Sequence, residues 1–402
     1  MQDGAPRPAV ARNLASSVYL PTFFFEIGIG AIYPILALSP IRMGASAALA
    51  SVAVGAYALG RIAGSSFGGG LVARWGSPRA ALVGMVWTAF AALVCAASAS
   101  LAPFILGAAL IGVGHALVHV SRQLQVAEIV PGNMRGRALT TLAGIWRIAN
   151  FVGPLVGALV IHSVGLRPAY VLAAAAMLVG GFALLAAPGR RSPAHAPQLR
   201  QVSPGRVIRE NRRVLGTLGL AVALTGAVRG ARIVALPLWA AHLGLSDGTA
   251  SAIFAVSAAV DMVLFLPAGV VMDKWGRRWI ALPSTLLLGL GMVALPLTAG
   301  VATITVVAVI LGVGNGWGSG LLMTLGVDVA PAEGRQVFLG LWMVLQDVGG
   351  LVGPAIVSLG ALASLPVGIV SVGAIGVAAT GLLGRWLPSR RLSEGAGVVA
   401  TD

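Results

Sequence analysis

Thiols and charged side chains are scarce in this sequence of 402 residues. Cys95 is the single cysteine, which excludes an internal disulfide bond and a thiolate metal cluster. Charged residues make up 10% of the chain, whereas soluble domains carry about 25%. Apolar residues reach 57%, which is more than one soluble core can bury. The composition therefore excludes an ordinary soluble domain and predicts helices covered by lipid.

Motifs of the common enzyme classes give no support for catalysis. The sequence contains no Gly-x-x-x-x-Gly-Lys-Ser/Thr phosphate loop and no catalytic Cys/His arrangement. We therefore expect no enzymatic activity and no cofactor, and a membrane enzyme or sensor is the weakest of three alternatives. The net charge of +15 comes from arginines in short segments between apolar runs, so we expect no nucleic-acid partner. Such segments are typical of loops on the inner side of a membrane.

Twelve apolar stretches are long enough to cross a bilayer, which takes about 20 residues. Arginine-rich connections alternate with connections of few or no charges, and short loops rich in Lys and Arg remain in the cytoplasm. We expect a multi-pass protein of a bacterial-type inner (cytoplasmic) membrane with both termini cytoplasmic. The predicted spans are 14–38, 47–72, 79–99, 102–129, 137–162, 167–187, 214–242, 248–272, 279–299, 302–328, 336–362 and 365–386.

The chain repeats itself at an offset of 200 residues. Arg74-Trp75-Gly76 corresponds to Lys274-Trp275-Gly276, and Gly153-Pro154 corresponds to Gly353-Pro354. The repeat predicts two related six-helix bundles, residues 1–187 and 214–402. Between them, residues 188–213 form a basic linker, which we expect in the cytoplasm with a short surface helix near Val207 that anionic headgroups attract. Such duplication in an apolar chain is typical of transporters whose halves move around a central site.

Several motifs carry a resemblance to a known family. Residues 269–278 read Gly-Val-Val-Met-Asp-Lys-Trp-Gly-Arg-Arg, which resembles the loop signature of the major facilitator superfamily. Arg135-Gly136-Arg137 and Gly153-Pro154 resemble that superfamily's cytoplasmic turn and its Gly-Pro-rich antiporter motif, which is common among drug and metabolite exporters. The resemblance implies an all-α integral membrane protein with twelve transmembrane helices in two pseudo-symmetric six-helix bundles. It also implies rocker-switch alternating access.

The first of the two related loops departs from the family pattern. It has Ala73 where the family has Asp, while Asp273 is retained beside Lys274 in the second loop. The resemblance implies a carboxylate latch at the cytoplasmic gate, so we expect Asp273 to contact the start of the fifth span near Arg135 and Arg137. A solvated surface acid is the alternative. The small residues of the Gly-Pro motifs would let helices approach closely and pivot, and we assign to gating Gly153, Pro154, Gly353 and Pro354.

Apart from Arg79, Arg167 and Arg385 at span ends, charged residues inside the spans avoid the third, sixth, ninth and twelfth spans, which form the lipid-facing scaffold in the superfamily. A charge at the bilayer centre costs about 2.5–3.5 kcal/mol, and such residues usually line a functional cavity. Arg61 is the repeat mate of Asp261, and Arg147 is the mate of Asp347. We expect Arg61 and Asp261 to act in gating, and a static salt bridge is the alternative.

Glu26 lies near the middle of the first span, where it either binds a proton or cation or pairs with an arginine. His115, His119 and Arg122 share one face of the fourth span, and imidazole titrates near physiological pH. Two histidines without a third ligand predict no metal site. The predicted substrate-binding and proton-binding residues are Glu26, His115, His119, Arg122, Arg147, Asn150, Arg229, Arg232, Asn315 and Asp347.

The sequence thus predicts a secondary active transporter that resides in the lipid bilayer as a monomer. We expect proton-coupled export of small amphipathic molecules, either drug-like compounds or metabolites. The alternative is an organic-anion transporter, for uptake or exchange, in which intramembrane arginines bind the anion. The fourth span carries Ala108 where resembling proton antiporters often have arginine, so proton coupling follows less directly than the fold.

Overall fold

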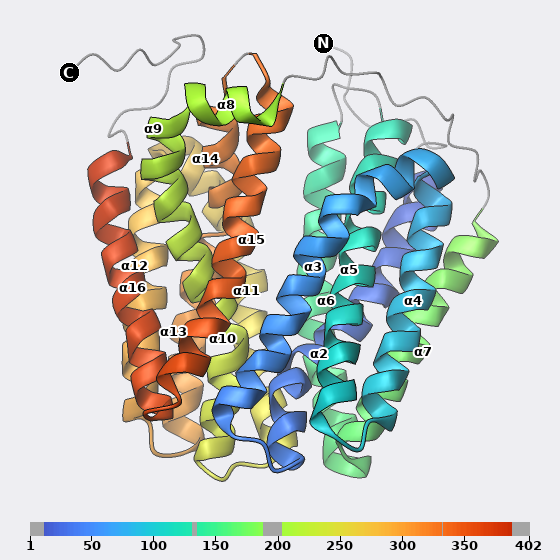
Figure 1. The fold of residues 1–402 in the computed structure, drawn as a ribbon, viewed down its shortest axis with the longest axis vertical. Coiled ribbons are helices and arrows are strands. Elements are labelled where there is room, and N and C mark those ends of the chain that lie inside the picture. Colours follow the sequence, from blue (N-terminus) through green and yellow to red (C-terminus); the bar gives the residue numbers. More distant parts are fainter. Residues whose placement is uncertain (1–11, 131–134, 188–202, 332, 388–402) are drawn as a thin grey trace. The chain divides into compact units, whose positions relative to one another are not determined.

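The structure, a computed structural model, describes residues 12–130, 135–187, 203–331 and 333–387 (Figure 1). Over these residues the regular structure is helical and contains no strand. Twelve helical stretches within them are long and apolar enough to cross a membrane. The all-α fold and the number of spans predicted from the sequence are therefore confirmed.

The first six spans pack in a defined order. Helix α3 packs on α5, α5 on α4, α4 on α7, and both α7 and α6 pack on α2. A π-helical turn, η1 (Ala15–Tyr19), precedes the first of these helices. The helices are α2 (Leu20–Arg42), α3 (Ala47–Trp75), α4 (Ser77–Ala97), α5 (Leu101–Ile129), α6 (Arg135–Val164) and α7 (Leu166–Ala186).

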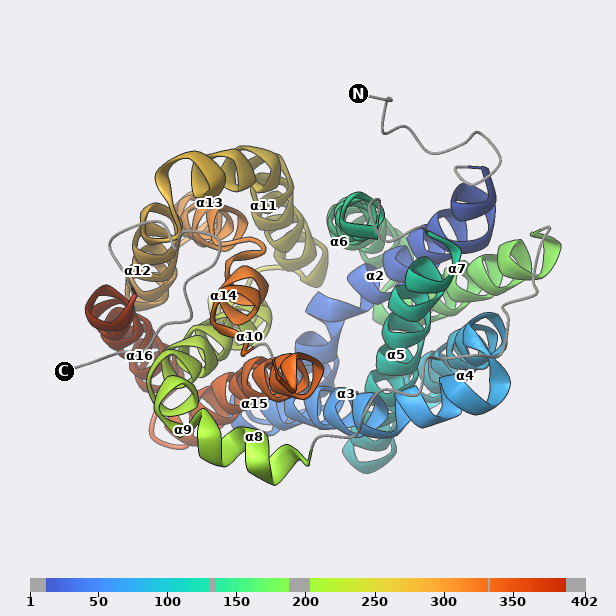
Figure 2. The ribbon, with the colours of Figure 1, turned by 90° about the horizontal axis from the view of Figure 1, so that it is seen from above.

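The second six spans follow a short helix, α8 (Pro204–Glu210), which confirms the helix predicted near Val207. Val207 is buried in an apolar cluster with Leu218 and Trp342, and α8 lies beside α15 (Figure 2). The remaining elements are α9 (Arg212–Val214), η3 (Leu215–Gly219), α10 (Leu220–His242), α11 (Asp247–Trp275), α12 (Arg278–Ala294), η4 (Leu295–Leu297), α13 (Val301–Trp317), α14 (Leu321–Val329), α15 (Arg335–Gly360) and α16 (Leu365–Trp386).

The chain forms two compact units. Among the described residues, the first unit contains those up to 187 together with Leu236–Ala258, and the second contains 203–235 and 259–387. The first unit thus includes a segment that the repeat assigns to the second bundle. Within this unit, Arg42 at the end of α2 pairs with Asp247 at the start of α11, with 2.8 Å between Nε and Oδ2.

Local backbone features recur at the same 200-residue offset as the sequence. Gly44 and Gly244 adopt φ angles of +82° and +73°, and Gly76 and Gly276 adopt +80° and +97°. Glycine reaches such angles without the strain that a Cβ atom would cause, which explains these residues at the turns. The π turns η1 and η3 also lie 200 residues apart. The duplication therefore extends to the backbone geometry.

Large apolar side chains remain exposed along several helices. On α4 they include Phe90 at 59% exposure, and on α7 Phe182 at 72%. On α12 and α16 they include Trp279, Leu290 and Val367. Exposure of this much apolar surface to water is unfavourable, whereas lipid tails can cover it. These four helices therefore present a surface suited to acyl chains.

The tenth span is broken, which the sequence did not predict. Helix α13 ends at Trp317 and α14 begins at Leu321, with Gly320 between them at a φ of +74°. Its repeat mate, α5, is continuous. Backbone groups freed by a break inside a membrane need partners from neighbouring protein. Arg229 of α10 supplies one, because its guanidinium donates to the Gly318 carbonyl at 2.7 Å.

Candidate functional site

Glycines allow α3 and α5 to approach so closely that polar side chains of the two helices meet. A Cβ atom at Gly112 of α5 would overlap the carbonyl oxygen of Tyr57, and one at Gly60 of α3 would overlap that of Ala109. With glycine at both positions the backbones come into contact. This contact places the Tyr57 side chain beside His115, three residues after Gly112.

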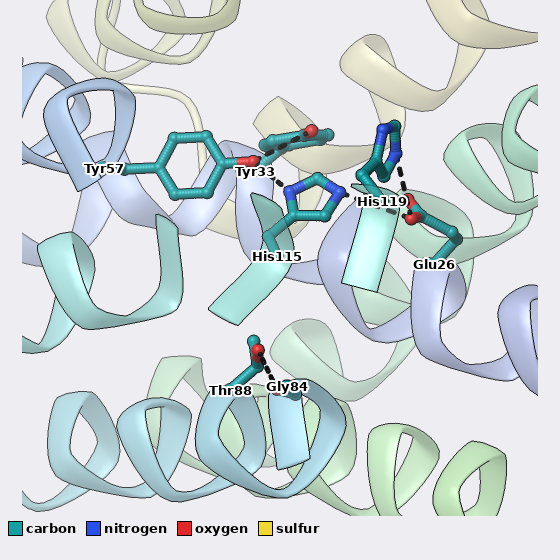
Figure 3. A network of polar contacts seen from close by, with 7 residues as sticks. All are labelled: Glu26, Tyr33, Tyr57, Gly84, Thr88, His115 and His119. Carbon is teal, nitrogen blue, oxygen red and sulfur yellow. Dashed lines mark hydrogen bonds and ion pairs between the residues drawn. The ribbon is translucent and has the colours of Figure 1, made fainter. Parts of the chain in front are cut away.

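The Glu26 side chain of α2 contacts both histidines of α5 (Figure 3). Its Oε1 atom is 3.3 Å from Nε2 of His115 and 3.4 Å from Nε2 of His119. Glu26 and His115 are buried, whereas the His119 side chain is 20% exposed. A buried carboxylate is costly unless it is paired, and two imidazoles provide that pairing here. We call Glu26, His115 and His119 the Glu-His cluster.

Aromatic side chains surround the Glu-His cluster. The Tyr57 hydroxyl hydrogen-bonds with Nδ1 of His115 and also with the Tyr33 hydroxyl (Figure 3). The His119 ring stacks on Trp146 of α6 with 4.0 Å between centroids. Arg61 of α3 is near enough to Tyr33, Tyr57 and His115 to interact with them electrostatically. The four helices α2, α3, α5 and α6 thus contribute to one polar group inside the first unit.

A second polar group lies inside the second unit, centred on Asp261 of α11. Asn315 and Ser319 both hydrogen-bond with its carboxylate, and Arg232 of α10 lies 3.9 Å from it. Gly316 makes this possible, because a Cβ atom there would overlap the backbone of Asp261. The Asp261 side chain is 14% exposed, so the carboxylate is paired but still accessible. We call these four side chains the Asp261 cluster.

A third contact is repeated in both units, with different chemistry. Ser77 at the start of α4 donates to Glu128 at the end of α5 at 2.9 Å. The repeat mates Arg277 and Asp328 form a two-bond ion pair at 2.8 and 3.2 Å. Ser77 therefore occupies the position at which the second unit has the guanidinium of Arg277.

In the first unit Arg122 supplies the positive charge that Ser77 lacks. Arg122 is fully buried and donates to the carbonyls of Ser17 at 2.9 Å and Ser77 at 3.5 Å. Glu128 is also near enough to interact with it electrostatically. Arg122 thus joins the starts of the first and third spans to the end of the fourth.

The predicted site residues separate into groups within each unit. The structure brings Glu26, His115 and His119 together, and separately Arg232, Asp261 and Asn315. Arg122 belongs to the Ser77 contact, and Arg229 to the helix break. Partly buried positions on α6 and α15 hold Arg147, Asn150 and Asp347.

The predicted gating residues lie at several separate places in the structure, and their gating role stays a prediction. Asp261 contacts Arg232, Asn315 and Ser319 of its own unit, and the pairing of Arg61 with Asp261 stays a prediction. Gly153 and Gly353 pack α6 on α2 and α15 on α10, because a Cβ atom at either would overlap a carbonyl oxygen of the neighbouring helix. Pro154 and Pro354 follow them inside these helices, and Lys274 is exposed. The side chains of Asp273, Arg135 and Arg137 lie outside the described residues, so the latch stays a prediction.

Sequence reasoning missed Tyr33, Tyr57, Ser319 and Asp328. Tyr57 lies four residues before Arg61 on the same face of α3, and that spacing was the one available signal. Asp328 is the repeat mate of Glu128, so the repeat was the signal that could have identified it. Ser319 carries no such signal, because its role depends on the break after α13.

Known proteins share this sequence pattern and fold. Multidrug resistance protein MdtL of Klebsiella pneumoniae (strain 342) is 24% identical over 321 residues, which cover 77% of this chain and 82% of that protein. A D-xylose-proton symporter superposes with a TM-score of 0.73 at 16% identity, covering 94% of this chain and 98% of the symporter. A variant of the nucleoside transporter NupG gives a TM-score of 0.75 at 11% identity, covering 92% and 98%.

Among solved structures, a bacterial homologue of the human lysosomal transporter Spinster gives a TM-score of 0.68 at 15% identity, covering 95% of this chain and 96% of that one. The family model of the Major Facilitator Superfamily matches residues 18–354 and, again, 218–400. The second match reflects the internal repeat. This chain is therefore a multi-pass membrane transporter that belongs to the Major Facilitator Superfamily.

Proposed function

We propose that this protein is a proton-coupled exporter of small amphipathic molecules. The similarity to a multidrug resistance protein supports export of such compounds. Each unit contains a polar cluster with a carboxylate inside a span, and such intramembrane ionisable groups support a role in proton or substrate binding. The main support for proton coupling is the Asp261 cluster, in which a carboxylate in the middle of a span lies beside the guanidinium of Arg232.

Protonation of Asp261 changes what Arg232 can bind. The groups that face the carboxylate include Arg232 from α10, and Asn315 and Ser319 from α13 and the break that follows it. A proton on Asp261 removes the negative charge beside Arg232 and weakens this pair, so the guanidinium can exchange that contact for polar groups of a substrate. Loss of the proton restores the pair and weakens that binding. Proton and substrate affinity are then linked reciprocally, as coupled transport requires.

The organic-anion alternative depends on the same arginines. Arg229 already donates to the Gly318 carbonyl, and Arg232 already lies beside Asp261. An anion would have to displace at least one of these contacts, and no described feature places two arginines around a shared open site. The contacts therefore favour the proton-coupled exporter, and the anion transporter remains an outcome of the test.

The test uses everted membrane vesicles with an acidic interior and a fluorescent amphipathic dye. Wild-type vesicles should accumulate dye, and an uncoupler should abolish the accumulation. Asp261→Asn should lose accumulation driven by the pH gradient but retain dye exchange between equal pH values. Glu333→Gln, which changes an exposed acid, is the matched control.

Two results would contradict the proposal. One is accumulation by Asp261→Asn vesicles at the wild-type rate with the same sensitivity to the uncoupler. The other is exchange of organic anions that the uncoupler does not affect, together with no movement of the amphipathic dye. The second result would support the anion transporter instead.

A further inference from the structure

The Glu-His cluster brings together the three donor atoms that a transition-metal site needs. His115 and His119 are one helical turn apart on α5, and Glu26 reaches them from α2. One ligand atom from each of the three residues lies within 4.8 Å of the others. The sequence shows the histidine pair but does not identify a third ligand. The packing of α2 near α5 brings Glu26 to the pair as that third ligand.

The distances around the carboxylate fit tetrahedral coordination. Bonds of about 2.0–2.1 Å to nitrogen and oxygen place neighbouring ligand atoms of a tetrahedron about 3.3–3.4 Å apart. The two Nε2 atoms lie 3.3 and 3.4 Å from Oε1 of Glu26. Two of the three edges are thus already formed, and rotation of the partly exposed His119 ring can adjust the third.

The surroundings also orient the ligands. When Nδ1 of His115 carries the proton, it donates to the Tyr57 hydroxyl, and Nε2 keeps a lone pair directed toward Glu26. Metal-bound histidines usually use their second nitrogen in this way, and such partners fix the ring and its tautomer. The His119 ring also stacks on Trp146 of α6.

The net charge near the Glu-His cluster indicates which kind of metal ion would bind. Glu26 contributes one negative charge, and Arg61 nearby contributes one positive charge. Net charge alone therefore gives little attraction for a hard cation such as Mg²⁺ or Ca²⁺. Imidazole ligands suit Zn²⁺ and its transition-metal neighbours, for which coordination bonds supply the affinity.

We propose that Glu26, His115 and His119 form a binding site for a divalent transition-metal ion of the Zn²⁺ class. The fourth coordination position is open to water or to a donor atom of a bound small molecule. Trp146, whose ring stacks on His119, also has a buried Nε1 without a hydrogen-bond partner among the described residues. The 20% exposure of His119 gives the ion access to the site.

The experiment measures metal binding by the purified full-length protein in detergent, without a histidine tag. Co²⁺ serves as a visible probe, because ligation by histidine in a tetrahedral site produces strong absorption bands. Titration should give one saturable site, Zn²⁺ should displace Co²⁺, and Mg²⁺ should not. Calorimetry with Zn²⁺ then gives the affinity.

Three variants locate the site. His119→Gln and Glu26→Gln should each weaken Zn²⁺ binding by more than the about 10–100-fold that loss of an outer partner costs at metal sites. His162→Gln changes an exposed histidine outside the cluster and should bind as wild type does. Gel filtration and thermal melting of each variant verify that the fold is retained, and the partly exposed position of His119 makes His119→Gln the milder change.

Either of two results would overturn the proposal. One is the absence of both visible Co²⁺ bands and Zn²⁺ binding heat in folded wild-type protein. The other is a folded His119→Gln variant that binds Zn²⁺ with wild-type affinity. Because the measurement is made at equilibrium in detergent, neither result depends on proton coupling or on the direction of transport.

Discussion

At the scale of single residues, the two units place a positive charge near equivalent acidic residues in different ways, through Arg122 in the first unit and Arg277 in the second. Both place a guanidinium near an acid that ends the fourth or tenth span. In the second unit Arg277 lies in the loop and pairs directly with Asp328. In the first, Ser77 occupies the loop position, and the charge comes from Arg122 inside α5. A buried arginine can thus serve a structural contact rather than a substrate.

Arg122→Met tests this structural role. Methionine fills a similar volume but leaves the Ser17 and Ser77 carbonyls without their charged donor. Hydrogen bonds to charged groups contribute about 1.5–3 kcal/mol, so we expect a free energy of unfolding lower by about 2 kcal/mol. Thermal melting in detergent measures the loss, and Arg206→Met, on the exposed face of α8, should leave the melting temperature unchanged. Equal melting temperatures for wild type and Arg122→Met would show that Arg122 is not a structural contact.

At the scale of helices, close backbone contacts at glycine determine which helices are neighbours. Gly353 of α15 packs against Ala227 of α10, and its repeat mate Gly153 of α6 packs against Ile27 of α2. Gly60 and Gly112 do the same for α3 and α5. Such contacts replace side-chain interdigitation with main-chain proximity, as membrane helices often do. The Gly-Pro motifs are therefore packing contacts within each unit.

Gly353→Ala and Gly340→Ala form a matched pair on α15. A methyl group at 353 would overlap the Ala227 carbonyl oxygen, whereas one at 340 meets nothing within 4 Å. We expect Gly353→Ala to lower the free energy of unfolding by about 1–3 kcal/mol through overpacking. Gly340→Ala should leave stability unchanged or raise it by up to about 1 kcal/mol through helix propensity. Similar effects of both changes on melting would contradict the packing role.

The helices were predictable because long apolar runs and charged loops determine their number and limits. The break after Trp317 was not, since Asn315 and the glycines around it also fit a continuous span. For the candidate site, helical spacing placed His115 and His119 on one face. Their contact with Glu26 depends on how α2 packs near α5, which one sequence does not reveal. The repeat-based pairing of Arg61 with Asp261 rests on symmetry rather than on packing, and it stays a prediction.

At the scale of the whole molecule, the arrangement of charge predicts the orientation in the membrane. The basic residues of α8 and α9 lie at one end of the second unit, and the sequence predicts that this end is cytoplasmic. Ser203 precedes α8, whereas Ser364 lies between α15 and α16 at the opposite ends of the spans, and both are exposed. Labelling at these two positions can therefore report which end of the second unit faces the cytoplasm.

Single cysteines at these positions test the orientation in intact cells. Ser364→Cys should react with an impermeant thiol reagent added outside, and Ser203→Cys should react only after permeabilisation. Cys95 is buried, so its own reaction should remain small, and the unmodified chain provides the background. Labelling of Ser203→Cys from outside would reverse the predicted orientation.

The π turns at Ala15–Tyr19 and Leu215–Gly219 have a consequence for insertions and deletions. A π turn closes its hydrogen bonds one residue later than an α turn, so it absorbs an additional residue. One residue corresponds to about 100° of rotation around a helix. The turn therefore sets the angular phase between the membrane-edge portion of the first or seventh helix and the interior portion that carries Glu26 or Arg229. Deleting a single residue there would convert the π turn into an α turn and keep the phase of the two portions, whereas the same deletion elsewhere in the helix would rotate one portion against the other by about 100°.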